Sequence, residues 1–220
     1  MPDLTNYKLV RSHRKTLSIE ITAEGSMIVR APNRCSVGEI RKFILSKEEW
    51  IEKVINQQAK RTLLQIPEKI KENTTIPYLG SKYPVIWFDQ KNPLIEGYCY
   101  LPIKWQGKST QKKLILWMKK EAQVYLTKRT GDWSACLKIP IKSIAITSAK
   151  KRLGSCNRKK DIRFTWRIMM LPPTLIDYII LHELAHIKVH AHNKDFWKLM
   201  LEWLPTLPLL KKELKTYLIA

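Results

Sequence analysis

A cluster of histidines near the C-terminus has the spacing of a metal site. The sequence His-Glu-Leu-Ala-His at residues 182–186 places two histidines four residues apart. Residues four apart on a helix differ by about 40° around its axis, so both imidazoles project from one face and can share a tetrahedral zinc ion. Glu183 lies about 100° from His182, which lets its carboxylate reach a metal-bound water without becoming a ligand.

A hydrolytic zinc site needs a third protein ligand, and two further histidines are candidates. His190 continues the series, but three histidines along one straight helix do not converge easily on one tetrahedral ion. His192 lies farther along, where the helix can end and the chain can turn back, and Asn193 can cap the next helix. We therefore favour His192 over His190 as the third ligand.

The clustering of these histidines argues for chemistry. Of 5 histidines in the chain, 4 fall within residues 182–192, inside or just after an apolar helical pattern. The alternative interpretation is that these are surface histidines of an amphipathic helix without a function. Surface histidines are rarely so concentrated. Zinc lowers the pKa of bound water and polarises the bond under attack, while Glu183 can remove a proton and return it to the leaving group. The predicted chemistry is therefore hydrolysis with Glu183 as the general base.

The first part of the chain, residues 1–75, predicts a lobe of a β-hairpin and helices. Residues 16–22 alternate apolar and polar side chains, and Ala-Glu-Gly-Ser indicates a turn into a second strand at 27–31. Two Ser-x-x-Glu capping boxes, which begin at Ser36 and Ser46, predict the starts of two helices.

The rest of the chain, residues 76–220, predicts the catalytic domain. Pro173 is well placed as the first residue of the helix that carries the histidines. The expected elements are strands at 85–88, 98–101 and 161–168, and helices at 110–130, 173–190, 193–203 and 207–218.

The net charge of +21 is concentrated upstream of the histidines. Residues 104–170 hold 18 Lys and Arg against 3 Asp and Glu, a net charge of +15. Arg152 and Ser155 lie in the most basic part, which could hold phosphate through charge and backbone NH groups. Arg163 and Arg167 could flank a substrate along the strand that contains them. We therefore expect a substrate that is anionic or attached to something anionic.

The chain lacks the features of exported and membrane proteins. Its N-terminus has no apolar core of a signal peptide, and no apolar stretch reaches the roughly 18 residues of a membrane helix. Its 4 cysteines are scattered, without the close spacing of a zinc knuckle or a redox pair. We expect a cytoplasmic protein with free thiols and no membrane partner.

Further motifs extend over most of the chain. They are Arg-Ala-Pro at 30–32, Ser-Lys-Glu-Glu-Trp at 46–50, Arg-Leu-Gly-Ser-Cys at 152–156, Ile-Arg-Phe-Thr-Trp-Arg at 162–167, Pro-Pro at 172–173, Ile-Asp-Tyr at 176–178, His-Glu-Leu-Ala-His at 182–186 and His-Asn-Lys-Asp-Phe-Trp at 192–197. With these motifs the sequence resembles the YgjP-like metallopeptidase family, which is similar to the SprT-like zinc proteases. The resemblance implies an α+β, zincin-like catalytic domain in which one zinc ion is held by His182, His186 and His192, with Glu183 as the base.

Three hypotheses for the substrate remain open. A metallopeptidase would bind an extended peptide or protein along the edge of strand 161–168, unless that strand is interior. The resemblance also implies nucleotide hydrolysis as an alternative, because the splitting of UTP has been attributed to a member of the family. In the third hypothesis, the basic residues 104–170 contact nucleic acid, and the protein is a nucleic-acid-associated protease or binding protein.

Overall fold

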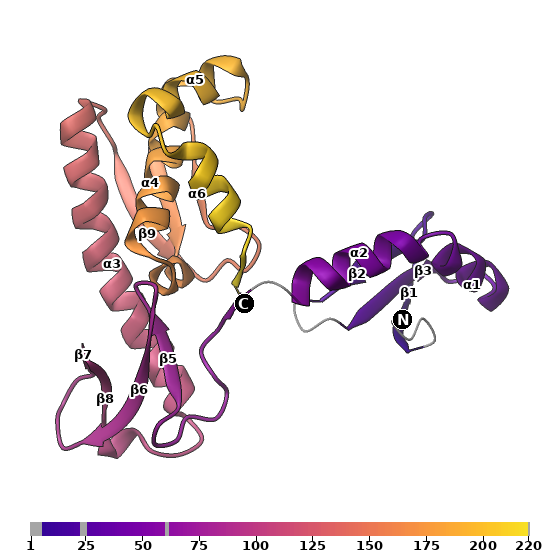
Figure 1. Ribbon diagram of the computed structural model, residues 1–220, viewed down its shortest axis with the longest axis horizontal. Helices are drawn as coiled ribbons and strands as arrows, with labels where there is room; N and C mark the ends of the chain where they lie inside the picture. Colours follow the sequence, from indigo (N-terminus) through magenta and orange to yellow (C-terminus); the bar gives the residue numbers. More distant parts are fainter. Residues whose placement is uncertain (1–5, 23–25, 60–61, 220) are drawn as a thin grey trace. The chain divides into compact units, whose positions relative to one another are not determined.

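The structure, a computed structural model, describes residues 6–22, 26–59 and 62–219 (Figure 1). Helices and strands are mixed along the chain, which confirms the predicted α+β class. Within the described residues, no helix is both long and apolar enough to cross a membrane.

The chain divides into two compact units. The first consists of residues 1–63 and 215–218, and the second of residues 64–214 and 219–220. The predicted functional boundary between residues 75 and 76 stays a prediction, because compactness does not show which residues catalysis needs.

The first unit is a three-stranded sheet with two helices. Its elements are β1 (Tyr7–Ser12), β2 (Ser18–Ile21), β3 (Met27–Pro32), α1 (Val37–Leu45) and α2 (Glu48–Ala59). Strand β3 is central, parallel to β1 and antiparallel to β2, with Ser18 opposite Arg30. The β2–β3 pair confirms the predicted hairpin, although residues 23–25 of its turn lie outside the described residues. Strand β1 was not predicted. The core joins Val29 of β3 to Ile40 of α1 and Ile51 of α2.

Only one of the two predicted capping boxes exists. The Ser36 hydroxyl accepts a hydrogen bond from the backbone NH of Glu39 at 3.2 Å, and the Glu39 carboxylate accepts one from the NH of Ser36 at 2.7 Å. The prediction of a second box at Ser46 is wrong. Ser46 has helical backbone angles and ends α1, and its hydroxyl donates to the carbonyl of Phe43 at 2.8 Å. An N-cap needs an extended backbone, which Ser46 does not have.

The second unit carries most of the chain. Its strands are β5 (Thr75–Tyr78), β6 (Ser81–Phe88), β7 (Leu94–Glu96), β8 (Tyr98–Pro102), β9 (Ser143–Thr147), β10 (Gly154–Cys156) and β11 (Asp161–Thr165), and its helices are α3 (Thr110–Leu137), α4 (Pro173–Lys188), α5 (Lys194–Trp203) and α6 (Leu207–Leu214). One sheet has the strand order β5-β6-β8-β7 and another the order β10-β11-β9. The predicted strands at 85–88 and 98–101 lie within β6 and β8. Two short strands, β4 (Thr62–Leu64) and β12 (Tyr217–Ile219), consist mostly of residues of the first unit and pair with each other.

The strand predicted at 161–168 and the last predicted helix both end earlier than expected. The strand predicted at 161–168 stops at Thr165, and a 3-10 helix follows over Trp166–Met170. All five residues of this 3-10 helix are buried, so the alternation that predicted a longer strand does not continue. The helix predicted at 207–218 ends at Leu214, before β12 begins.

Helix α4 is held by neighbours along its length. It contacts α3, β10, α5 and α6 (Figure 1). The guanidinium of Arg129 in α3 donates two hydrogen bonds to the carboxylate of Asp177, at 2.7 and 2.6 Å, and the indole NH of Trp133 donates to the same carboxylate at 3.1 Å. Apolar residues such as Ile180 and Leu184 are fully buried. This packing makes α4 a rigid support for polar side chains.

Candidate metal centre

Helix α4 positions the first two histidines. Pro172 and Pro173 begin the helix, where the missing NH of proline costs no hydrogen bond. His182 and His186 then project from one face, with ring centroids 4.9 Å apart. The helix ends at Lys188, slightly before the predicted end, because Val189 takes an extended conformation.

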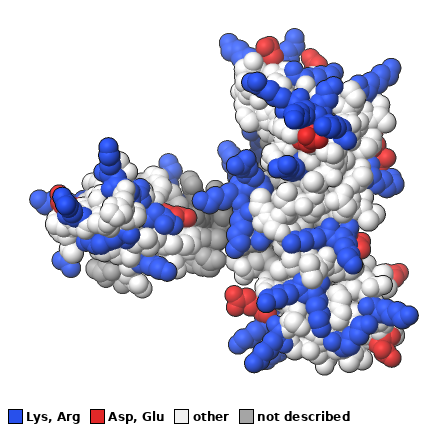
Figure 2. All heavy atoms as spheres, turned by 180° about the vertical axis from the view of Figure 1, so that it is seen from behind, with Lys and Arg blue, Asp and Glu red and all other residues white. Residues whose placement is uncertain are grey.

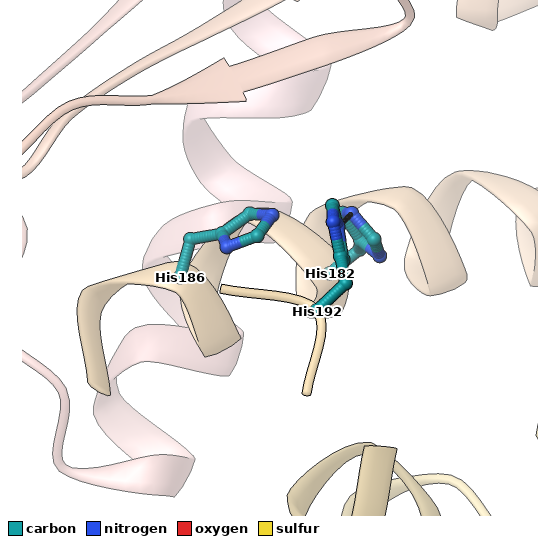
Figure 3. Close-up of side chains that lie close together, drawn as sticks. All are labelled: His182, His186 and His192. Carbon is teal, nitrogen blue, oxygen red and sulfur yellow. Dashed lines mark hydrogen bonds between the residues drawn. The ribbon is translucent and has the colours of Figure 1, made fainter. Parts of the chain in front are cut away.

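The turn after α4 brings the third histidine back. Asn193 caps α5, as predicted, with its side-chain oxygen accepting from the backbone NH of Phe196 at 3.0 Å. His192 just before this cap returns to α4, and its Nε2 lies 3.0 Å from Nε2 of His182. The nitrogen atoms of His182, His186 and His192 that could bind a metal all lie within 4.8 Å of one another. Figure 3 shows the three side chains gathered at one place. His190 is not part of this group.

One pair of imidazoles has nearly the spacing that a tetrahedral ion requires. Zinc binds imidazole nitrogens at about 2.0–2.1 Å, which separates two such nitrogens by about 3.3 Å. The 3.0 Å between His182 and His192 is close to this value. Burial and the neighbouring histidines lower the pKa of His182 to about 4, so its ring is neutral at pH 7 and keeps a lone pair for a metal. The Nδ1 of His186 lies 3.3 Å from the carbonyl of Val189, which leaves its Nε2 for the ion.

Aromatic rings support the histidines. Phe196 is fully buried, and its ring centroid lies 5.0, 4.7 and 4.8 Å from those of His182, His186 and His192. The Nδ1 of His182 is buried without a hydrogen-bond partner among the described residues. Such an unsatisfied group costs about 1–3 kcal/mol, and Nε2 of His182 is the ring nitrogen that faces His192. Phe196 was not singled out from the sequence, because its role depends on where α5 packs.

Glu183 is the buried carboxyl of the site. Only 5% of the residue is exposed, and burial raises its pKa to about 7. A carboxyl with this pKa exchanges a proton readily at neutral pH, as a general base must. Strand β10 lies against it at Gly154, where an added Cβ would come within 2.5 Å of a Glu183 carboxylate oxygen. A glycine at this position leaves the room that the carboxyl occupies.

Two hollows reach the histidine cluster. The smaller has a volume of about 240 Å³ and is lined by Arg152, Leu153, Gly154, Tyr178, Ile179, His182, Glu183 and Leu214. The larger has a volume of about 810 Å³ and is lined by His192, Asn193, Lys194, Trp197, Lys198, Leu201 and Glu202. Because one includes His182 and the other His192, both open at the same cluster.

The predicted substrate-binding residues lie in different environments. Arg152 is exposed and lines the smaller cavity, so part of the basic segment lies next to His182, as expected. Ser155 in β10 is half-buried and stands opposite Arg163 of β11, which is exposed. Arg167 is 8% exposed and donates to a backbone carbonyl at 3.0 Å. The structure therefore brings Arg152 to the site and gives Arg167 a place in the core.

Comparison with known proteins adds a family relationship. The sequence model of the YgjP-like metallopeptidase domain matches residues 15–217 of the 220-residue chain. This match spans both compact units and includes the histidine cluster. A search of curated proteins finds no match.

Proposed function

The chain belongs to the YgjP-like metallopeptidase family, and from this membership and the site geometry we propose that it is a zinc-dependent metallopeptidase. The observation that carries the proposal is the group of His182, His186 and His192 beside the buried carboxyl of Glu183. In this proposal the histidines are the three protein ligands of one zinc ion. The fourth position of the ion belongs to water and substrate, as in other catalytic zinc sites.

In the proposed reaction, Glu183 moves the proton. Zinc, when bound, supplies a water of lowered pKa and polarises the scissile carbonyl. The Glu183 carboxylate takes up a proton through one of its oxygens and later delivers it to the leaving amine. Burial raises the pKa of Glu183 and so makes its carboxylate a stronger base, which assists the first step, while Gly154 leaves space for the side chain.

Strand β10 is the proposed docking edge for a peptide. Of the two alternatives for residues 161–168, an edge strand or an interior strand, the interior one is correct, because β11 is the central strand of the β10-β11-β9 sheet. Strand β10 is an edge of that sheet, contacts α4, and has no second strand partner among the described residues. A strand edge offers backbone hydrogen bonds to an extended peptide. Together with the two hollows, this edge favours an extended substrate.

Hydrolysis of nucleoside triphosphates such as UTP is the second candidate. The observation in its favour is that Arg152 of the basic segment lines the same cavity as His182 and Glu183. The cavity of about 240 Å³ is small for a whole nucleotide, since ligand pockets usually measure about 300–1,000 Å³. We therefore place the peptidase first.

The proposal is tested by offering both kinds of substrate to one preparation. Purified protein with measured zinc content is incubated with casein and, separately, with UTP and the other nucleoside triphosphates. The Glu183→Gln variant is the control, because it keeps the shape of the side chain and removes the base. We expect casein cleavage that is lost in the variant and on chelation of zinc. If the wild type releases pyrophosphate or phosphate, the Glu183→Gln variant does not, and neither cleaves casein, the peptidase proposal is replaced by the second candidate.

A further inference from the structure

The smaller cavity beside Glu183 has the lining of a site for one anionic group. Its walls are largely apolar, and its polar side chains besides the two site residues are Arg152 and Tyr178. Within the part of the chain that the structure describes, neither the guanidinium of Arg152 nor the hydroxyl of Tyr178 has a hydrogen-bond or ion-pair partner. Both donors are therefore available to a ligand.

The loop that carries Arg152 is anchored on both sides. The buried side chain of Arg167 donates to the carbonyl of Ser148 at 3.0 Å, before the basic residues begin. After them, the backbone NH of Thr165 donates to the carbonyl of Leu153 at 3.0 Å. These bonds fix the loop to the core of the unit. Arg152 thus belongs to a built wall of the cavity, and Arg167 acts as its anchor.

The positive charge of Arg152 is not neutralised by the general base. Both residues line the cavity, but among the described residues no ion pair joins Arg152 to Glu183. Lys150 and Lys151 precede Arg152 and are exposed, so their charges add to the positive potential around the cavity. An anion that enters the cavity therefore meets uncompensated positive charge.

Tyr178 supplies a second donor at the same place. It lies one helical turn before His182 in α4, and its ring packs edge-on against that imidazole with centroids 6.1 Å apart. The residue is 7% exposed and lines the cavity. A tyrosine hydroxyl carries a proton that it can donate to an anion.

We propose that this cavity binds a carboxylate of the peptide substrate next to the scissile bond, with Arg152 supplying charge and Tyr178 a hydrogen bond. A volume of about 240 Å³ suits one side chain or chain end. The carboxylate comes either from an Asp or Glu side chain or from the C-terminus of the peptide. This inference rests on the proposed peptidase function and gives it a substrate class, namely acidic peptides.

The test compares peptides that differ by one charge. In the first series of fluorogenic peptides, one position near the cleaved bond holds either Glu or Gln. This position is varied from peptide to peptide. A second series differs only in a free or amidated C-terminus, which separates the two sources of the carboxylate. We expect wild-type kcat/KM to favour the acidic member of one series by about 10-fold or more, because charged hydrogen bonds are the strong ones. Arg152→Gln should remove this preference, and Tyr178→Phe should reduce it.

The matched control is Arg158→Gln. Arg158 lies in the same basic stretch, is exposed, and does not line the cavity. The Arg158→Gln variant should keep the wild-type preference for the acidic peptide. Thermal unfolding of each variant shows whether the fold is intact, and because Arg152 is exposed its replacement should leave the unfolding temperature unchanged.

Binding measurements separate this inference from the proposed function. Labelled Glu and Gln peptides are titrated onto Glu183→Gln and onto the double variant that also carries Arg152→Gln. Cleavage by the wild type without any preference that depends on Arg152 would overturn the carboxylate site and leave the peptidase standing. Absence of cleavage combined with acidic-peptide binding that requires Arg152 would support the site and overturn the peptidase. Neither cleavage nor such binding would overturn both.

Discussion

At the scale of single residues, the environment of Glu183 decides what its carboxyl can do. The residue type and its place beside His182 indicate a general base from the sequence alone. Its burial and its contact with Gly154 depend on where β10 packs, which the spacing of residues on α4 does not reveal. The group is therefore identifiable from the sequence, whereas the cause of its raised pKa lies in the packing that the structure shows.

The raised pKa of Glu183 predicts a stability effect in the metal-free protein. Its pKa is about 7 in the folded state, against an ordinary value of 4.5. Below pH 4.5 the carboxyl is protonated in both states. As the pH rises from 4.5 to about 7, the unfolded chain releases the proton first, so the folded state loses stability by about 3 kcal/mol. Glu183→Gln cannot release a proton and avoids this loss.

The measurement is urea unfolding of both proteins, free of metal, at pH 5 and pH 8. The advantage of Glu183→Gln should be small at pH 5 and grow towards pH 8. The comparison removes the opposite contribution of His182, which is common to both proteins. A difference that stayed constant with pH would show that burial does not perturb the carboxyl.

Gly154 predicts a loss of activity with little loss of metal. A methyl group at this position would come within 2.5 Å of the Glu183 carboxylate and displace it. Because small displacements of catalytic groups can cost about 100-fold in rate, we expect Gly154→Ala to lower kcat/KM to a similar extent and to retain zinc. Gly131→Ala is the control, since nothing lies within 4 Å of the added methyl in α3. Equal activity of the two variants would contradict the contact.

At the scale of elements, α5 completes a site that α4 begins. His192 lies in the turn between them and, among the described residues, makes no hydrogen bond through Nδ1. Its ring instead stacks on Trp197, with centroids 5.7 Å apart and planes inclined by 22°. The ammonium of Lys211 lies 3.6 Å from the centre of the Trp197 ring, which ties α6 to the same stack. Packing therefore orients the third histidine.

Replacing Trp197 should weaken zinc binding. Without the stacked ring, His192 samples other orientations, and loss of such supporting contacts typically costs about 10–100-fold in metal affinity. We expect Trp197→Leu to lower zinc affinity within this range and Trp197→Phe to recover part of it, as measured by competition with a chelator. The visible spectrum of the cobalt-substituted protein should change in Trp197→Leu.

Trp203 offers a matched control in the same helix. It also has a lysine over its ring, with the Lys188 ammonium 5.6 Å from the ring centre. Among the described residues, its ring does not contact any of the three histidines. Trp203→Leu should leave zinc affinity unchanged even if it lowers stability. Equal losses of affinity in both variants would mean that Trp197 acts only through the stability of α5.

Helices and strands could be predicted from the sequence where capping residues and apolar patterns match the way in which the element packs. Ser36 begins a helix because its backbone is extended, whereas Ser46 has the same sequence signature and a helical backbone. Apolar and polar residues alternate over 161–168, which indicated a strand. Beyond Thr165, however, every residue of the 3-10 helix is buried, so the alternation no longer reports two faces of a strand. Asn193 was found by its type and position, while β10, only three residues long, gave no sequence signal of its own.

At the scale of the whole molecule, positive charge covers both compact units. Figure 2 shows Lys and Arg side chains spread over the visible face, as expected for a net charge of +21. Such a field draws anions by long-range attraction and is screened by salt. Contact of residues 104–170 with nucleic acid stays a prediction, while Arg152 within this segment lies at the cavity beside the site.

The charge predicts a salt effect that depends on the substrate. Raising the ionic strength from about 0.01 to 1 M shortens the screening length from about 30 to 3 Å. We expect kcat/KM for an acidic peptide to fall over this range, while kcat/KM for a neutral peptide of equal length changes little. Equal salt dependence for both peptides would show that the positive field does not guide the substrate.

The proposed zinc site depends on which histidines hold the metal. The decisive measurement is zinc per chain after dialysis, for the wild type and for single alanine variants of His182, His186, His190 and His192. The wild type and His190→Ala should retain one zinc ion, and the other three variants should lose it. Retention of zinc by His192→Ala, or its loss from His190→Ala, would contradict the site proposed here.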